Sequence, residues 1–356
     1  MESSIDVWAG AAVYDRIRSG DFSFDDVSGV VGPAVGPRWF LSAGFDLALM
    51  RERVLGLKNP VTLAGASAGA LRFAAWVQPE PEKAYRLLME SYRSMAFSRR
   101  DTRESIQQIL SQVIDSYVED DAVSFALNNR NYRLAFTVAR ARHLLSAENP
   151  VLQFSGLVVA GLANLFSPST LPLFFQRVLF YSGYTPPAFS RNREFPGMPI
   201  PLNEANFKRV LLASSSVPLR VAAVKNIYGA PRGAYRDGGL VDYHGNQCHG
   251  NGGNDVVLHF HHQERLVPTW FDGRLRRRTL PDDWTRNLLV VSPSKEFLEG
   301  LPGGKIPDRN DFKVFADNPG ERLNRWERVI AASEPLGDVF MNLVAGGGIR
   351  HAVRRL

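Results

Sequence analysis

A serine set among small residues is the first feature of the sequence that suggests chemistry. Residues 62–71 read TLAGASAGAL, so Ser67 stands in a Gly-x-Ser-x-Gly pattern between Gly65 and Gly69. A nucleophilic serine on a tight strand-to-helix turn needs small neighbours, because its backbone is strained and other segments approach closely. The helix expected to begin at Ala68 would favour negative charge near the serine oxygen. The pattern therefore predicts a nucleophile, with an ordinary strand-to-helix junction as the alternative.

A nucleophilic serine needs a base, and the first candidate is an aspartate. Asp237 lies in YRDGGLVD, where Gly238 and Gly239 allow a sharp turn that leaves the carboxylate at the mouth of a site. A carboxylate within hydrogen-bond reach takes a serine proton directly, so a dyad is chemically sufficient. A simple Asp-Gly turn is the alternative interpretation. Asp242 in the same segment is expected to be structural.

Histidines are the second candidates, since many α/β-hydrolases place serine, acid and histidine in that order along the chain. None of them occupies a short glycine-flanked loop late in the sequence, although order alone leaves a Ser-His-Asp esterase open as an alternative. The HFHH stretch has no acidic partner at a clear ligand spacing, so no metal is expected. Cys248 has no supporting motif. The histidines considered are His244, His249, His259, His261, His262 and His351.

Three motifs, in one order along the chain, resemble those of the patatin-like phospholipase family. They are GASAG around Ser67, ASSSVP at 213–218 and DGG at Asp237, within a match that spans about Val30 to Asp242. The resemblance implies a layered patatin-like α/β fold and a Ser-Asp dyad that uses no histidine. It also implies hydrolysis of lipid acyl esters, as in a phospholipase A or lysophospholipase, through an acyl-enzyme and without a cofactor.

The glycine-rich oxyanion loop of that family, commonly GGGxRG, is altered in this sequence. AVGPRW at 34–39 stands in its place, where Gly36 and Arg38 match the third glycine and the arginine. The amides of Val35, Gly36, Arg38 and Ala68 are the expected oxyanion donors, whereas Pro37 has no N–H. Losing one donor typically costs about 2.7 to 4 kcal/mol of transition-state stabilisation. The second hypothesis is therefore a catalytically weak or inactive protein that binds a membrane surface or a partner. For Arg38 the alternatives are shaping this loop, binding a phosphate headgroup, or a surface position.

Strands and helices alternate around these motifs. Alternation of this kind predicts an α/β fold in which a central, mostly parallel sheet is flanked by helices and carries the site at its strand ends. We divide the chain into an N-terminal extension (1–26), a catalytic domain (27–300) and a C-terminal helical extension (301–356). Strands are expected at 27–31, 60–65, 132–139, 255–260 and 287–292, and helices at 7–17, 42–55, 68–77, 81–116, 320–332 and 336–345.

An apolar stretch at 151–189 interrupts the catalytic domain. Polar residues and prolines, such as Ser155, Asn164 and Pro168, are expected to split it into short helices that form a cap or an interfacial insert, with ordinary core as the alternative. No run reaches 18 uninterrupted apolar residues, so a membrane-spanning helix is not expected. The N-terminus lacks the features of a signal peptide, and cytoplasmic residence, with peripheral contact at a membrane, is the resulting expectation.

Composition supports a globular chain with a basic surface. The 356 residues are 45% hydrophobic, and 42 Lys+Arg against 36 Asp+Glu give a net charge of +6. Arg274, Arg276, Arg277 and Arg278 form one cluster, which fits either a solvated face or attraction to an anionic membrane. No nucleic-acid motif is present, so the expected partner is a lipid or phospholipid substrate. A single cysteine excludes an intramolecular disulfide, and the sequence leaves the oligomeric state open.

Overall fold

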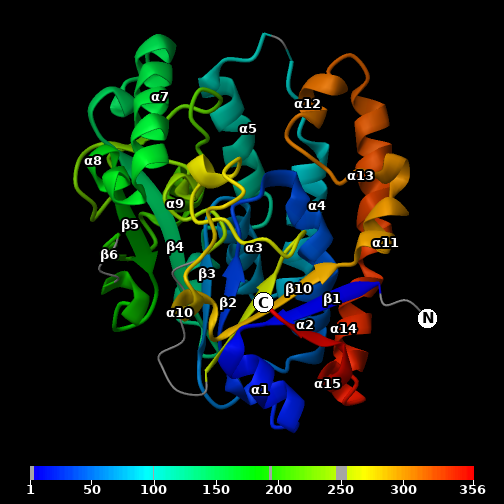
Figure 1. Cartoon of the computed structure of the whole chain (residues 1–356). Helices are drawn as coiled ribbons and strands as arrows, with labels where there is room; N and C mark the ends of the chain where they lie inside the picture. Colours follow the sequence, from blue (N-terminus) through cyan, green and yellow to red (C-terminus); the bar gives the residue numbers. More distant parts are fainter. Residues whose placement is uncertain (1–3, 99, 192–194, 246–254) are drawn as a thin grey trace.

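The computed structural model describes residues 4–98, 100–191, 195–245 and 255–356, and in this part of the chain eleven strands form one sheet (Figure 1). The strands are β1 (Ile5–Ala9), β2 (Val27–Gly32), β3 (Val61–Gly65), β4 (Tyr132–Ala141), β5 (Phe175–Tyr181), β6 (Met198–Pro201), β7 (Val224–Lys225), β8 (Ala234–Arg236), β9 (Val256–Phe260), β10 (Leu288–Pro293) and β11 (Val353–Arg355). Their order is β11-β1-β10-β9-β2-β3-β4-β5-β6, and β8 pairs with both β4 and β7.

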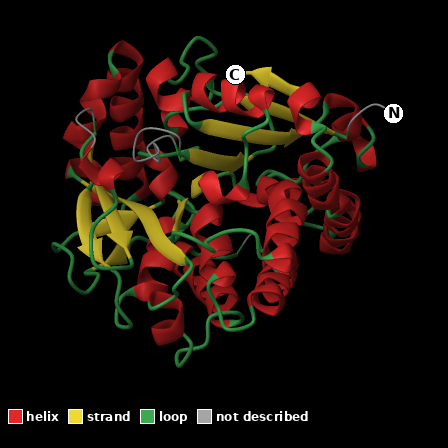
Figure 2. Cartoon of the chain, turned by 90° about the horizontal axis from the view of Figure 1, so that it is seen from below, coloured by secondary structure: helices red, strands yellow, loops and turns green. Residues whose placement is uncertain are grey.

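Helices surround this sheet (Figures 1 and 2). The α-helices are α1 (Ala11–Ser19), α2 (Ala43–Glu52), α3 (Ala68–Trp76), α4 (Pro81–Ser94), α5 (Arg103–Asp115), α6 (Val123–Leu127), α7 (Pro150–Phe166), α8 (Leu171–Phe174), α9 (Phe207–Ser214), α10 (Asp282–Thr285), α11 (Lys295–Glu299), α12 (Asp311–Val314), α13 (Pro319–Ser333), α14 (Pro335–Ala345) and α15 (Ile349–Ala352). The antiparallel neighbours are β1–β10, β4–β5, β4–β8 and β7–β8, and the other pairs are parallel. The prediction of an α/β fold around a mostly parallel sheet is confirmed.

Alternating side chains of the central strands fill two different cores. On β9, Val256, Leu258 and Phe260 point into the larger core, and Val257 points into the smaller one on the opposite face. This alternation follows from the two-residue repeat of a strand. Because both faces are covered, the strands read as continuous apolar runs, which is why the sequence revealed them.

The two ends of the chain differ from the sequence-based expectation. Residues 7–9, expected to begin a helix, belong to β1, and only Ala11–Ser19 is helical. The apolar side chains at Ile5, Val7 and Ala9 are buried in a strand period of two, which a helical reading of Val7 and Ala11 overlooked. β11 pairs in parallel with β1, so both termini contribute strands to the edge of the sheet.

The apolar stretch at 151–189 also folds differently. Ser155 and Asn164 do not interrupt α7, a single helix of 17 residues, and the expected set of short helices is wrong for this part. The second half of the stretch forms β5, which pairs with β4 inside the sheet. Among the helices of the described residues, none has both the length and the apolarity needed to cross a bilayer.

Candidate active site

Ser67 occupies the turn between β3 and α3, with φ 52° and ψ −121°. A positive φ is unfavourable for a residue that carries a side chain, so the surrounding structure must hold this turn in place. The contact between α3 and β2 explains the flanking glycines, since a β-carbon on residue 69 would lie 1.8 Å from the carbonyl oxygen of Gly32. A β-carbon on residue 65 would lie 2.6 Å from the carbonyl carbon of Gly69. The strand, turn and helix expected around Ser67 are therefore present.

Asp237 faces Ser67 from the end of β8. The Ser67 hydroxyl donates a hydrogen bond to Asp237 Oδ2 at 2.8 Å. The other carboxylate oxygen, Oδ1, accepts the Gly239 amide at 2.8 Å, and the Asp237 amide donates to the carbonyl of Ser216 at 3.0 Å. Gly238 lies so close to β4 that a β-carbon there would be 2.1 Å from the carbonyl oxygen of Thr137. Two segments that are 170 residues apart in the sequence thus bring a hydroxyl and a carboxylate into direct contact.

Burial controls the acidity of this carboxyl group. Ser67 is 4% and Asp237 is 5% exposed. Burial raises the pKa of Asp237 above its ordinary value, because the charged form loses solvation. The positive charge of Arg309 and the hydrogen bonds from Ser67 and the Gly239 amide oppose this rise. A carboxylate with a raised pKa is a stronger base toward a serine proton than an exposed aspartate.

The loop before α2 lies beside the dyad, and not all of its amides are available. Ala34 donates its N–H to the carbonyl of Tyr243 at 2.7 Å, and Val35 donates its own to the carbonyl of Pro33 at 3.0 Å. Gly36 has φ 58°, which explains the glycine at this position. Gly36 and Ala68 are each the first residue of a helical segment, so the helix itself does not use their backbone N–H groups. Within the described residues, neither amide donates to another backbone carbonyl.

Arg38 does not point its charge at Ser67. Its guanidinium pairs with Asp308 through Nε at 3.1 Å and Nη2 at 2.5 Å. Asp308 belongs to the segment before α12, so this ion pair joins the C-terminal part of the chain to the loop that carries Gly36. Arg309, next to Asp308, lies against that loop, with Nε 2.7 Å from the point where a β-carbon on residue 36 would stand. The cation beside the dyad is therefore Arg309.

Sequence reasoning missed Arg309 and Ser214. Ser214 accepts the amide of Ser67 at 2.8 Å and donates to the carbonyl of Thr137 at 2.8 Å, so it fixes the nucleophile turn to β4. The ASSSVP motif pointed to this segment without giving its first serine a task. For Arg309 no local signal exists, because the residue acts from a loop some 240 positions after Ser67.

The other candidate residues of the sequence have different outcomes. Asp242 accepts a hydrogen bond from Thr137 Oγ1 at 3.3 Å and lies 3.7 Å from Arg177, as a structural residue would. Cys248 and His249 lie outside the described residues. Of the histidines that are described, none donates to or accepts from Ser67. No group of three or more His, Cys, Asp and Glu side chains in the described ranges is placed to hold a metal ion.

Four histidines instead form a buried cluster of rings. The ring centroid of His261 lies 4.2 Å from that of His244, 5.1 Å from that of His259 and 4.3 Å from that of His262. Burial lowers the pKa of His261 to about 3, and burial, followed by repulsion from neighbouring histidines, lowers the pKa of the other three well below the usual value. All four rings are therefore neutral in the folded protein at neutral pH.

This cluster predicts a fold that loses stability in mild acid. The folded-state pKa values lie below the unfolded value of about 6.5, so the stabilisation is present above pH 6.5 and is lost as the pH falls below it. Each histidine adds up to about 1.4 kcal/mol per pH unit to the slope of unfolding free energy against pH. Urea unfolding at a series of pH values from 7.5 to 5.5 measures that slope. His261→Gln should reduce the slope and exposed His351→Gln should not; equal slopes in both variants would contradict the prediction.

Comparisons with known proteins add a distant structural likeness. The sequence matches no model of a protein family and no curated protein. Among solved structures, human GIVD cytosolic phospholipase A2 is similar with a TM-score of 0.37 and 12% identity. The likeness covers 96% of this chain and 62% of that chain, so this chain spans less than two thirds of the other's length. A likeness of this extent carries no conclusion about activity, which must be argued from the site.

Proposed function

We propose that the protein is a serine acylhydrolase that cleaves lipid acyl esters with Ser67 as nucleophile and Asp237 as base. The observation that carries the proposal is the 2.8 Å hydrogen bond from the Ser67 hydroxyl to Asp237, made from a strand-to-helix turn with a positive φ. A buried carboxylate at this distance is placed to accept the serine proton. The lipid character of the substrate rests on the motif resemblance and on the apolar surface of α7.

The chemistry divides into two half-reactions. Asp237 accepts the proton as Ser67 Oγ attacks the ester carbonyl, and the resulting oxyanion accepts hydrogen bonds from the amides of Gly36 and Ala68. The C–O bond to the alcohol then breaks, and Asp237 returns the proton to that leaving oxygen. Water attacks the acyl-enzyme while Asp237 accepts its proton, and the carboxylic acid leaves as Ser67 regains its hydrogen.

A fluorophosphonate probe tests this assignment directly. We expect the folded protein to form a covalent adduct at Ser67, because an activated serine displaces fluoride from such probes, and Ser67→Ala to give none. Ser333→Ala is the matched control, since Ser333 is also buried and only donates to the carbonyl of Val329. Intact-mass measurement after incubation reads out the adduct. Labelling that persists in Ser67→Ala would overturn the assignment.

The second candidate is a protein of the same fold that binds a lipid surface or a partner and turns over weakly. The observation in its favour is the loop at 34–39, where the amides of Ala34 and Val35 are already engaged, together with the burial of both dyad residues. Such a protein would remain unlabelled by the probe although it is folded. The same experiment therefore separates the two candidates.

A further inference from the structure

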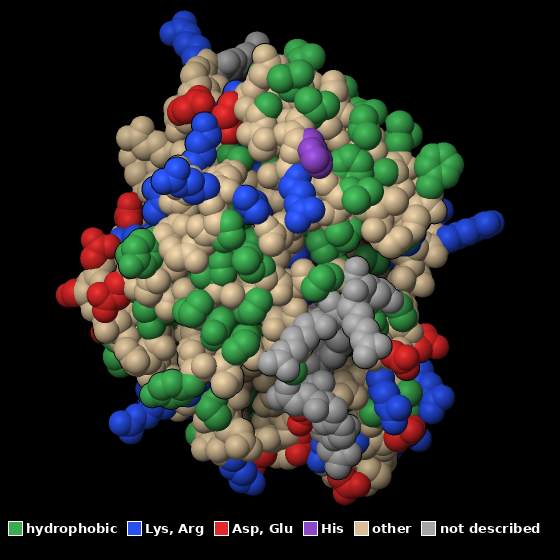
Figure 3. Space-filling view, turned by 90° about the vertical axis from the view of Figure 1, so that its left-hand side faces the viewer, with side chains coloured by type: hydrophobic (Ala, Val, Ile, Leu, Met, Phe, Trp, Pro, Cys, Tyr) green, Lys and Arg blue, Asp and Glu red, His purple; other side chains and the backbone are tan. Residues whose placement is uncertain are grey.

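The outer side of α7 is apolar over its whole length. From the residue after Glu148 to the residue before Arg177 the chain carries no charged side chain. Exposed apolar patches of more than a few hundred Å² on a monomer mark surfaces that contact a partner or a membrane. The outward side chains, which are 43% to 87% exposed, are Val151, Leu152, Phe154, Val158, Val159, Leu162, Leu165 and Phe166. Figure 3 views the molecule from the side that is on the left in Figure 1. Hydrophobic side chains gather in the upper part of this view, where α7 lies.

Two amide side chains fix which side of α7 faces outward. Gln153, near the first turn, is fully buried; its Oε1 accepts the amide of Leu219 at 2.6 Å and its Nε2 donates to the carbonyl of Ala147 at 3.0 Å. Asn164, near the last turn, is also fully buried and donates to Asp272 Oδ1 at 2.8 Å. Because both amides are bonded on the inner side, the helix cannot turn its leucines inward without breaking these contacts.

The structure places the basic cluster of the sequence at the C-terminal end of this helix. Arg278 donates from Nη1 to the carbonyl of Asn164 at 3.1 Å and from Nη2 to that of Leu165 at 3.3 Å, so it caps the last carbonyls of α7. Arg274, Arg276 and Arg277, in the same turn of chain, are exposed. An apolar face and a group of cations, separate in the sequence, therefore meet at one end of α7.

We propose that the outer face of α7 docks on an anionic lipid surface, with its apolar side chains among the acyl chains and the arginines of 274–278 against the headgroups. Amphipathic elements at an interface combine these two contacts, burial of apolar area and attraction of cations to anionic lipid. A second copy of the chain fits this face less well. Arg142 is exposed beside the 3₁₀ segment at His143–Ser146 that packs on α7, so cations flank the face on more than one side.

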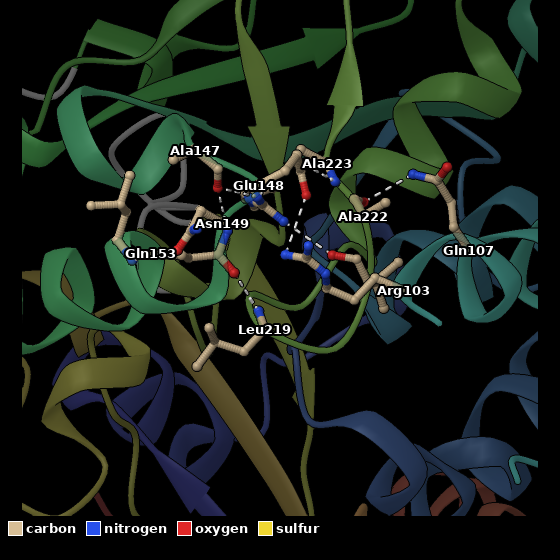
Figure 4. A network of polar contacts seen from close by, with 12 residues as sticks. Arg103, Gln107, Ala147, Glu148, Asn149, Gln153, Leu219, Ala222 and Ala223 are labelled. Atoms are coloured by element: carbon tan, nitrogen blue, oxygen red, sulfur yellow. Dashed lines mark hydrogen bonds and ion pairs between the residues drawn. The ribbon is translucent and has the colours of Figure 1, made fainter. Parts of the chain in front are cut away.

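The base of α7 is joined to the strand that ends at Asp237. Arg236, the preceding residue, donates to Glu148 Oε1 at 3.0 Å and to the carbonyl of Ala147 at 3.3 Å, directly before α7 begins. Figure 4 shows this network around Glu148, which also accepts the amide of Ala223 at 3.2 Å and pairs with Arg103. A bilayer held by α7 would thus be fixed in position relative to the carboxylate of the dyad. In this respect the inference rests on the proposed function and names the partner of its site.

Vesicle flotation of the full chain carrying Ser67→Ala tests the docking without turnover. We expect binding to vesicles of phosphatidylcholine with phosphatidylglycerol, and weaker binding to phosphatidylcholine alone. The triple variant Arg274→Gln, Arg276→Gln, Arg277→Gln should weaken binding to the anionic vesicles about 100-fold, since each cation at a membrane surface contributes about a fivefold factor. Leu162→Asp with Leu165→Asp should abolish binding to both vesicle types.

Leu57→Asp is the matched control, because Leu57 is as exposed as these residues but lies in the turn before β3. It should bind like the parent. Equal binding of the α7 double variant and the control, with thermal unfolding unchanged, would overturn the proposal. So would a dimer in analytical ultracentrifugation that the α7 variant converts to a monomer, since a second copy would then cover the face. Failure of the proposed function looks different, because a chain that no probe labels at Ser67 can still float with vesicles.

Discussion

Asp237→Asn is expected to reduce kcat on a short soluble ester about 10²- to 10⁴-fold, the range that general-base catalysis usually contributes. Asparagine keeps the size of the side chain and the hydrogen bond to Ser67, but it does not accept a proton. The double variant with Ser67→Ala should be no less active than Ser67→Ala alone, because two residues that act in one step are not additive. Initial rates with a chromogenic butyrate ester measure the effect.

Asp242→Asn is the matched control, since Asp242 lies five positions further on, is equally buried and contacts Thr137 instead of Ser67. We expect it to change kcat by much less than Asp237→Asn.

The pH dependence of kcat tests the same assignment in a second way. Burial raises the pKa of Asp237 and Arg309 opposes that rise, so Arg309→Met should move the acidic limb of activity to higher pH. An unchanged limb, or an active Asp237→Asn, would remove Asp237 as the base.

Asp46→Asn is expected to lower the free energy of unfolding by about 3 to 5 kcal/mol, because it leaves a buried guanidinium without its counter-charge. Asp46 on α2 and Arg72 on α3 are both completely buried and form two hydrogen bonds, at 2.7 Å and 2.8 Å. Tyr85 on α4 donates its hydroxyl to the same carboxylate. These three side chains join the helix that follows Ser67 to its two neighbours, so the loss should appear in urea unfolding at neutral pH.

Two further variants test whether the charge, and not the mutated position, causes the loss. Asp46→Leu combined with Arg72→Met removes both charges and should recover most of the stability, since apolar pairs often replace buried ion pairs at no net cost. Asp338→Asn breaks the exposed pair with Arg51 and should cost less than about 1 kcal/mol. A double variant as unstable as Asp46→Asn would mean that packing, not charge, accounts for the effect.

The sequence predicted the parts of this fold that depend on local pattern. Strand β3, which leads to Ser67, and strands β4 and β9 are largely apolar on both faces, and the helices at 319–333 and 335–345 show a clear helical period. The sequence predicted the pairing of nucleophile and base through the motif resemblance, because the spacing of the two residues does not show that they are neighbours. The structure places them in contact. Whether they act as a catalytic pair stays a prediction.

The features that the sequence did not reveal depend on tertiary contacts. Ser42, directly before α2, makes no capping hydrogen bond with its side chain, and its hydroxyl donates to the carbonyl of Phe260 on β9. α7 continues through Asn164 because its side-chain amide donates to Asp272 on the packed side of the helix, a partner far away in the sequence. Arg309 reaches the site from a distant segment, which the ion pair of its neighbour Asp308 with Arg38 joins to the loop of Gly36.

The contact between Gly32 and Gly69 joins the two loops of the proposed site. Gly32 ends the strand that leads into the loop of Gly36, and Gly69 lies in the first turn of the helix after Ser67. Main chain touches main chain there, with no side chain between them to repack or change rotamer. The distance between Ser67 and the Gly36 amide proposed to hold its oxyanion therefore depends on a direct contact between backbone atoms.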